Sequence, residues 1–120
     1  MIVDTTFLID LLNGKKDALE FSKNNYFATT SISVFEIMLG MKKSEEIQTK
    51  GLFEEVQVLN FDQECAVLSA NILKELKGKG LEIDFQDCMI ASICLKHKSV
   101  LVTKNLKHFQ RIKNLDVISY

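Results

Sequence analysis

The 120-residue chain contains no proline, few cysteines and no long apolar run. Because proline, internal repeats, low-complexity segments and linkers are all missing, we expect one compact domain over residues 1–120, a length that a single core usually covers. No apolar stretch reaches the roughly 20 residues needed to cross a bilayer, so no membrane association is expected. The N-terminus, MIVDTT, lacks a basic segment followed by a cleavage site, and we interpret it as a first strand rather than a signal peptide.

The three cysteines give no sign of a disulfide framework. Cys65, Cys88 and Cys94 are odd in number, form no Cys-x-x-Cys pair and fall within helical patterns. Buried free thiols are therefore expected, which is typical of a cytoplasmic protein. The two histidines, His97 and His108, have no zinc-ligand spacing and are expected at the surface.

Net charge is also low, at −1, which argues against a protein that holds nucleic acid by bulk attraction. The charge is unevenly spread, however. Residues 96–120 carry six cations against one acid, a balance of +5, whereas the rest of the chain carries nine cations against fifteen acids, a balance of −6. An acidic region beside a basic one suits the joint binding of a cation and a phosphate chain. On charge alone, a solvated lysine-rich surface is the simpler interpretation.

Short apolar strands alternate with helices along the sequence. Strands are expected at 2–3, 26–29, 56–59, 100–102 and 117–118, and helices at 5–12, 17–24, 33–40, 44–55 with an interruption at Gly51, 63–78, 85–97 and 106–109. This alternation predicts an α/β fold of three layers, with a mainly parallel central sheet of four to five short strands flanked by helices. Ligands of such sheets bind beyond the carboxyl ends of the strands.

Two carboxylates lie just beyond the first two predicted strands. Asp4 follows the first strand directly, where it either caps the next helix or points into the crevice, since Thr5 or Thr6 could provide the cap instead. Glu36 stands three residues after Ser33, the spacing of a capping box, and the same position is also at the mouth of the sheet. Capping and a role in a site both remain open for these residues.

The same ambiguity recurs in the second half of the chain. Asp84 can cap the helix that Asp87 enters at its third position, and Asp87 precedes the apolar run Met89–Ala91, so it is expected nearer the core. Asn105 and Thr103 follow the strand at 100–102, where Asn105 could instead cap the short helix at 106–109.

Three acids gathered at one edge of a sheet would raise one another's pKa unless a divalent cation neutralised them. Mg²⁺ or Mn²⁺ fits this role, because both are hard, oxygen-seeking ions that keep several water ligands. The acidic residues therefore predict a metal site without histidine or cysteine ligands.

Four segments, in this order and spacing, resemble the four sequence blocks of the PIN domain, and in particular those of VapC-type toxins of bacterial and archaeal toxin–antitoxin pairs. The segments are MIVDTTFLIDLLNG, SISVFEIMLG, GLEIDFQDCMIAS and LVTKNLKHFQRI. The resemblance covers nearly the whole chain, from Met1 to about Val117.

The resemblance assigns roles to individual residues. It implies that Asp4, Glu36 and Asp87 are catalytic metal ligands, and that Asn105 occupies the fourth catalytic position, where many PIN nucleases have aspartate. Asparagine removes one negative charge there, so we expect one firmly bound ion, with any second ion arriving with the substrate. Thr6 and Thr103 match hydroxyl positions that orient water or carboxylates. We leave Asp84 as a structural residue.

The implied function is a Mg²⁺- or Mn²⁺-dependent endoribonuclease that inhibits translation by cutting tRNA, rRNA or mRNA. The resemblance also implies a homodimer and a cognate VapB-type antitoxin, which places its C-terminal segment across the toxin groove and through which the complex binds operator DNA. We expect Lys104, Lys107 and Arg111 to hold the RNA backbone, which carries little sequence information.

Two alternatives have different chemistry. A receiver-like signalling domain shares the size and the α/β pattern, but it needs a pair of adjacent acids after the first strand, where this chain has Asp4 followed by Thr5. A PIN domain that has lost its activity and serves as a binding module is the other alternative. The three acids argue against it, whereas Asn105 keeps it open.

Overall fold

The computed structural model describes residues 1–120 and contains one five-stranded sheet in the order β3-β2-β1-β4-β5, with every neighbouring pair parallel. The strands are β1 (Ile2–Val3), β2 (Ala28–Thr30), β3 (Gln57–Leu59), β4 (Leu101–Val102) and β5 (Val117–Ile118). The helices are α1 (Thr5–Leu12), α2 (Lys16–Asn24), α3 (Ser31–Gly40), α4 (Glu46–Glu55, after the 3₁₀ turn Lys43–Glu45), α5 (Gln63–Gly78), α6 (Phe85–Lys96) and α7 (Leu106–Phe109). The predicted α/β fold with a parallel sheet is confirmed.

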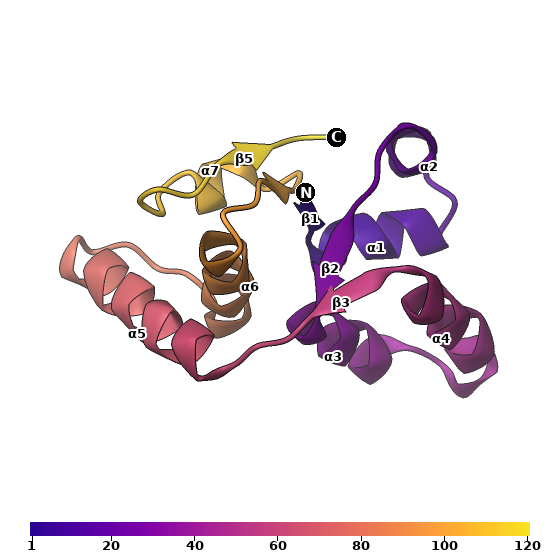
Figure 1. The fold of residues 1–120 in the computed structure, drawn as a ribbon, viewed down its shortest axis with the longest axis horizontal. Coiled ribbons are helices and arrows are strands. Elements are labelled where there is room, and N and C mark those ends of the chain that lie inside the picture. Colours follow the sequence, from indigo (N-terminus) through magenta and orange to yellow (C-terminus); the bar gives the residue numbers. More distant parts are fainter.

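Helices cover both faces of the sheet, as the three-layer prediction required. Figure 1 shows α5 and α6 on one side of the strands and α1 to α4 on the other. Successive side chains of a strand point to opposite faces, and both central strands follow this rule. Ile2 and Leu101 join the core beside α5 and α6, whereas Val3 and Val102 join the core beside α1 to α3. Two short strands therefore serve two separate cores.

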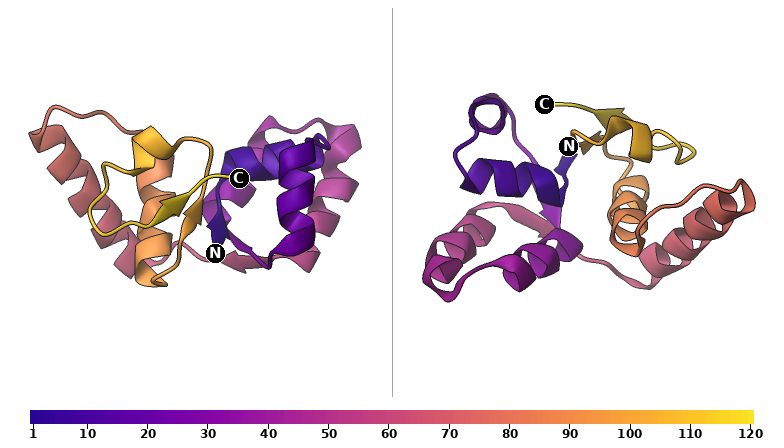
Figure 2. Two further views of the ribbon diagram at one scale, coloured as in Figure 1. Left: turned by 90° about the horizontal axis from the view of Figure 1, so that it is seen from above. Right: turned by 180° about the vertical axis from the view of Figure 1, so that it is seen from behind.

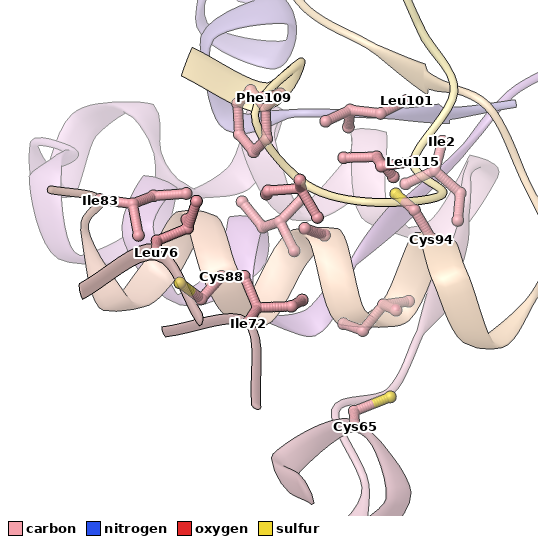
Figure 3. Packing of buried hydrophobic residues seen from close by; sticks show 14 residues of the cluster. Ile2, Cys65, Ile72, Leu76, Ile83, Cys88, Cys94, Leu101, Phe109 and Leu115 are labelled. Atoms are coloured by element: carbon pink, nitrogen blue, oxygen red, sulfur yellow. The ribbon is translucent and has the colours of Figure 1, made fainter. Parts of the chain in front are cut away.

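The larger core lies between the sheet, α5, α6 and the C-terminal segment. Phe109, Ile112 and Leu115 close it from the segment after β4, and Figure 3 shows Phe109 and Leu115 beside Leu101. The three cysteines are buried and free, as predicted, and all belong to this core. Burial raises the pKa of the Cys88 thiol to about 11, so this thiol is protonated and packs as an apolar group.

Most expected elements are found within a residue or two, and three of them differ in detail. The helix expected from Ser33 begins at Ser31, because Thr30 provides its cap. Gly51 does not interrupt α4, which runs through it. The second strand starts at Ala28 rather than Tyr26, whose side chain is fully exposed. No helix combines the length and the apolar character that a membrane crossing requires.

Candidate active site

Asp4 lies at the carboxyl end of β1 and caps α1. Its Oδ1 accepts a hydrogen bond from the backbone N–H of Phe7 at 2.9 Å, so the cap is Asp4 itself and not Thr5 or Thr6. Its side chain is nonetheless buried at the edge of the sheet. Desolvation raises the pKa of this carboxyl, and the hydrogen bonds from Thr103 and Phe7 only partly oppose the rise.

Glu36 projects from α3 and does not take part in a capping box. That prediction is wrong, because the Oγ1 of Thr30 accepts the Ser33 N–H at 3.1 Å and Ser33 lies inside the helix. Glu36 instead accepts a hydrogen bond from the Thr5 hydroxyl at 2.7 Å. Thr5 belongs to α1, so this bond joins the segment after β1 to the helix after β2.

Asp87 occupies the first turn of α6 and is half-buried. The pKa of its carboxyl is raised to about 6, mainly by burial and to a lesser extent by the charges of Asp84, Glu36 and Asp4, while the charge of His108 lowers it. Asp84 is the N-cap residue of α6, but its side chain makes no capping hydrogen bond. Asp84 therefore holds the N-cap position expected from the sequence, but without the side-chain hydrogen bond of a cap.

His108 is not the surface residue that its isolated position predicted. Its buried Nε2 lies 3.0 Å from Oδ2 of Asp87, although the orientation of the two groups gives Nε2 no hydrogen-bond partner. Arg111 holds the other side of the ring, with Nη2 at 3.0 Å from Nδ1 and Nε donating to the His108 carbonyl at 3.0 Å. Arg111 also donates to the carbonyl of Glu82 at 2.6 Å, which ties this group to the loop before α6.

The three acids are close enough to influence one another. The charge of Glu36 raises the pKa of Asp4, and the charges of both raise the pKa of Asp87. They do not form a ready-made cage, because no group of three His, Cys, Asp or Glu side chains is arranged to hold a metal ion. Asp87 faces His108 and Glu36 faces Thr5 instead. The donor chemistry, carboxylate oxygen alone, suits a hard divalent cation.

The supporting positions are only partly as expected. Thr103 is fully buried at the end of β4, beside Asp4, and accepts the N–H of Asn105 at 3.0 Å. Asn105 is exposed, and its side chain does not cap α7. Thr6 is exposed too, and the hydroxyl that contacts a site acid belongs to Thr5.

The cations expected to hold RNA have different surroundings. Lys104 pairs with Asp10 at 3.0 Å and with Asp17 at 2.7 Å, and its Nζ lies 4.8 Å from the ring centre of Tyr120. Arg111 is engaged with His108 and Glu82. Lys107 is exposed on α7. Two of the three cations are thus already committed to contacts within the protein.

Thr5 and His108 are the site residues that sequence reasoning missed. Both lie near a predicted position, Thr5 beside Asp4 and His108 three residues after Asn105. Their contacts join residues 31 and 21 positions apart, so no local pattern reports them. One sequence feature could have indicated His108: it belongs to the short helix that follows a predicted strand, and that end of a parallel sheet is where ligands bind.

Comparison with known proteins places this geometry in a family. The family model described as "PIN domain" matches residues 1–115. Ribonuclease VapC2 of Rickettsia felis is 34% identical over 95% of this chain and 92% of its own length, and ribonuclease VapC1 of Methanocaldococcus jannaschii is 31% identical over 100% and 86%. The match removes the receiver-like alternative.

Solved structures agree with the sequence comparison. The toxin–antitoxin complex VapBC of Salmonella typhimurium bound to DNA contains a chain with a TM-score of 0.87 and 27% identity, covering 98% of this chain and 96% of that chain. A chain of VapBC2 from Rickettsia felis, bound to a DNA fragment from its promoter, has a TM-score of 0.85 and 28% identity, covering 99% of this chain and 97% of that chain. This chain therefore belongs to the PIN-domain family, and within it to the VapC ribonucleases.

Proposed function

We propose that this ribonuclease is a Mg²⁺- or Mn²⁺-dependent endoribonuclease, the toxin of a VapBC-type pair, which cleaves cellular RNA and so inhibits translation. The observation that carries the proposal is the proximity of three acids from three separate segments at the carboxyl edge of a PIN-domain sheet, where the charge of Glu36 raises the pKa of Asp4 and the charges of both raise the pKa of Asp87. One relative, from Salmonella typhimurium, is named a tRNA(fMet)-specific endonuclease and is 27% identical to this chain.

In the proposed mechanism, Asp4, Glu36 and Asp87 hold the cation. A divalent ion bound there supplies a water of lowered pKa and stabilises charge on the scissile phosphate. Each acid has a neighbour within the chain: Thr5 donates to Oε1 of Glu36, the Phe7 N–H donates to Oδ1 of Asp4, and His108 lies against Oδ2 of Asp87. Glu36 and Asp87 each keep a second carboxylate oxygen, which would hold the ion. Thr103 supports Asp4 from the end of β4, and Asn105 is proposed to bind water or phosphate.

The inactive binding module remains the second candidate. Two observations favour it: Asn105 supplies one charge fewer than aspartate at the fourth position, and the acids form no cage. It predicts RNA binding without cleavage, which the following experiment separates from the nuclease.

We expect the purified protein to cut total cellular RNA when Mn²⁺ or Mg²⁺ is added and to stop when EDTA is added. Asp87→Asn should lower cleavage by a factor of at least about 100, because one donor oxygen loses its negative charge. Asp116→Asn is the matched control, since Asp116 is an exposed acid beyond the site. Cleavage that is unaffected by both EDTA and Asp87→Asn would contradict the metal assignment, and no cleavage by the unmodified chain would favour the binding module.

We further propose a homodimer that binds a VapB-type antitoxin, through which the complex contacts operator DNA. The VapBC structures of similar chains, some with DNA, support this partner class. A cavity of about 450 Å³ between α1, α3 and α4 reaches Glu36 and is lined in part by Ile9, Leu12 and Ile37. Its apolar lining suits an apolar segment of a partner, and its acidic end suits a basic side chain.

The cavity gives a test of that partner. Ile9 is 45% exposed at its rim, and Ile9→Arg should abolish co-purification with a VapB-type antitoxin that copurifies with the wild-type chain when the two are coexpressed. Val67→Arg, at an apolar position on α5 that is 56% exposed, is the control and should leave the complex intact. Equal recovery of the complex with both variants would contradict the placement of the antitoxin in this cavity.

A further inference from the structure

A second cavity lies beside His108, and none of the three acids lines it. It has a volume of about 550 Å³ and lies between the end of α5, the loop 79–84 and the start of α6. Its lining is half apolar and half polar: Leu73, Leu81, Ile83 and Phe85, with Lys77, Glu82, Asp84 and His108. His108 also lies 3.0 Å from Asp87, so this cavity and the candidate active site share one side chain.

Phe85 is the unusual residue of this cavity. Its ring is 62% exposed, although it stands only two residues before Asp87 in the first turn of α6. Phe7, Phe21 and Phe27, in contrast, pack edge to face in the smaller core, and among the phenylalanines only Phe35, at 59%, is comparably exposed. Phe85 therefore presents an open aromatic surface in this cavity, which is linked to the acids through His108.

The polar groups around Phe85 indicate what covers it. The Asp84 carboxylate makes no capping hydrogen bond, so it remains an available acceptor for N–H groups. Lys77 lies on the same cavity and carries a positive charge. An unpaired nucleobase uses all three groups, since it has a flat face to stack, amino or imino hydrogens to donate and a phosphate on each side.

The charge of the molecule supports the same occupant. The net charge is −1, and Lys104 and Arg111 are occupied by contacts within the protein, so two of the three cations expected to bind phosphates are already engaged. Stacking on an aromatic ring binds single strands without depending on net charge.

We propose that the Phe85 cavity is a base-binding subsite, in which the ring of Phe85 stacks on an unpaired base of single-stranded RNA next to the phosphodiester at the acids. The proposal rests on the proposed ribonuclease function and adds that the substrate is single-stranded at this point. Asp84 accepts hydrogen bonds from the base edge, and Lys77 contacts the flanking phosphate.

The first test uses the absence of tryptophan from the chain. Phe85→Trp places the only indole of the molecule in the subsite. We expect a short single-stranded oligoribonucleotide, added in EDTA to prevent cleavage, to quench the indole fluorescence in a saturable way. A matching duplex should quench it far less. Fluorescence that does not change with the single strand, while the same oligonucleotide binds by polarisation, would overturn the subsite.

The second test measures affinity. Phe85→Ala should weaken binding of the labelled single strand by about tenfold or more, as the loss of one base–aromatic stack does. Phe85→Leu keeps an apolar side chain without the ring face and should weaken binding almost as much. Tyr26→Ala is the control, because Tyr26 is an exposed aromatic before β2, at the opposite end of the strands. A series of oligonucleotides with one abasic position each should contain one that binds wild type and Phe85→Ala equally.

The outcomes separate this subsite from the nuclease itself. If wild type cleaves RNA and Phe85→Ala binds and cleaves like wild type, the subsite is wrong and the ribonuclease stands. If the single strand quenches the indole but wild type never cleaves with Mn²⁺, the nuclease proposal fails and the subsite stands. If Phe85→Ala changes the oligomeric state in sedimentation and leaves RNA affinity unchanged, the exposed ring serves a protein contact and the proposal is overturned.

Discussion

At the scale of single residues, Asp87 is held between opposing influences. Burial and three neighbouring acids raise the pKa of its carboxyl to about 6, while His108 favours the charged form. A carboxyl with a pKa near 6 gains or loses its proton close to physiological pH, whereas an ordinary aspartate, with a pKa of about 4, stays fully ionised there. Strong perturbation of this kind is typical of functional sites.

The raised pKa of Asp87 predicts the pH dependence of cleavage. Metal coordination needs the ionised carboxylate, so we expect Mn²⁺-dependent activity to rise about tenfold per pH unit below pH 6 and to level off above about pH 7. Initial rates on a labelled RNA between pH 5 and 8, at one subsaturating Mn²⁺ concentration, measure this, because saturating metal would displace the proton at every pH. A rate already constant from pH 4.5 upward would show that no carboxyl with a raised pKa limits the reaction.

The residue scale also shows what the sequence could and could not predict. The sequence predicted that Asp4 follows a strand and that Asp87 lies at the start of a helix, because local patterns indicate both positions. The partners of these acids were not, since His108 reaches Asp87 across 21 residues and depends on how α7 packs. Lys104 was predicted to bind RNA because its charge is visible in the sequence, but its pairing with Asp10 and Asp17 is visible only in the fold.

At the scale of elements, helix starts show where local patterns compete. Thr30 and Ser33 are both good cap residues, and the sequence alone favoured Ser33 because Glu36 completes a capping box. The pairing of β2 with β1 and β3 fixes where the strand ends, at Thr30, and the helix then begins at Ser31. Strand pairing thus makes Thr30 the N-cap residue of α3, and Glu36, which has no capping role, accepts the hydrogen bond from Thr5.

The loop between α5 and α6 carries both Asp84 and the Glu82 carbonyl that binds Arg111, and it begins at a strained position. Gly80 has φ of +72°, so alanine there would be forced into the left-handed region. We expect Gly80→Ala to lower the free energy of unfolding by about 1 kcal/mol, measured by urea denaturation. No atom lies within 4 Å of the added Cβ, so the cost comes from the backbone alone.

Gly78 provides the control for that change. It is the last residue of α5, its added Cβ is equally free of contacts, and it lacks the positive φ. Gly78→Ala should therefore leave stability unchanged or raise it by up to about 1 kcal/mol. Equal destabilisation by both substitutions would show that the loop, and not the conformation of Gly80, is responsible.

At the scale of the whole molecule, the candidate site lies where the two cores meet. Asp4 follows β1, whose side chains enter both cores, while Glu36 comes from the α3 side and Asp87 from the α6 side. Figure 2 shows these helices on opposite sides of the strands in two further views. The alternation of apolar residues predicted two covered faces, but the strand order, which places β1 between β2 and β4, depends on pairing that no local pattern specifies.

A cation held by all three acids would therefore link the two halves of the molecule, and its effect on stability is a prediction for the whole chain. Because the folded-state pKa of Asp87 lies above its ordinary value, ionisation of Asp87 opposes folding: its contribution favours folding at low pH and is lost as pH rises through about 6. At pH 7 without metal, the repelling carboxylates remain as a cost that a bound divalent ion relieves.

We expect Mn²⁺ at about 100 times its dissociation constant to stabilise the wild-type protein by roughly 2.7 kcal/mol at pH 7, because it binds the folded chain and not the unfolded one. For a domain of this size that corresponds to an increase of about 10 °C in Tm, measured by calorimetry with and without EDTA. Asp87→Asn should have a higher Tm than wild type in EDTA, since the repulsion is gone, and should gain little from Mn²⁺. A Tm that rises equally in both proteins would mean that the ion binds elsewhere and that the three acids do not share it.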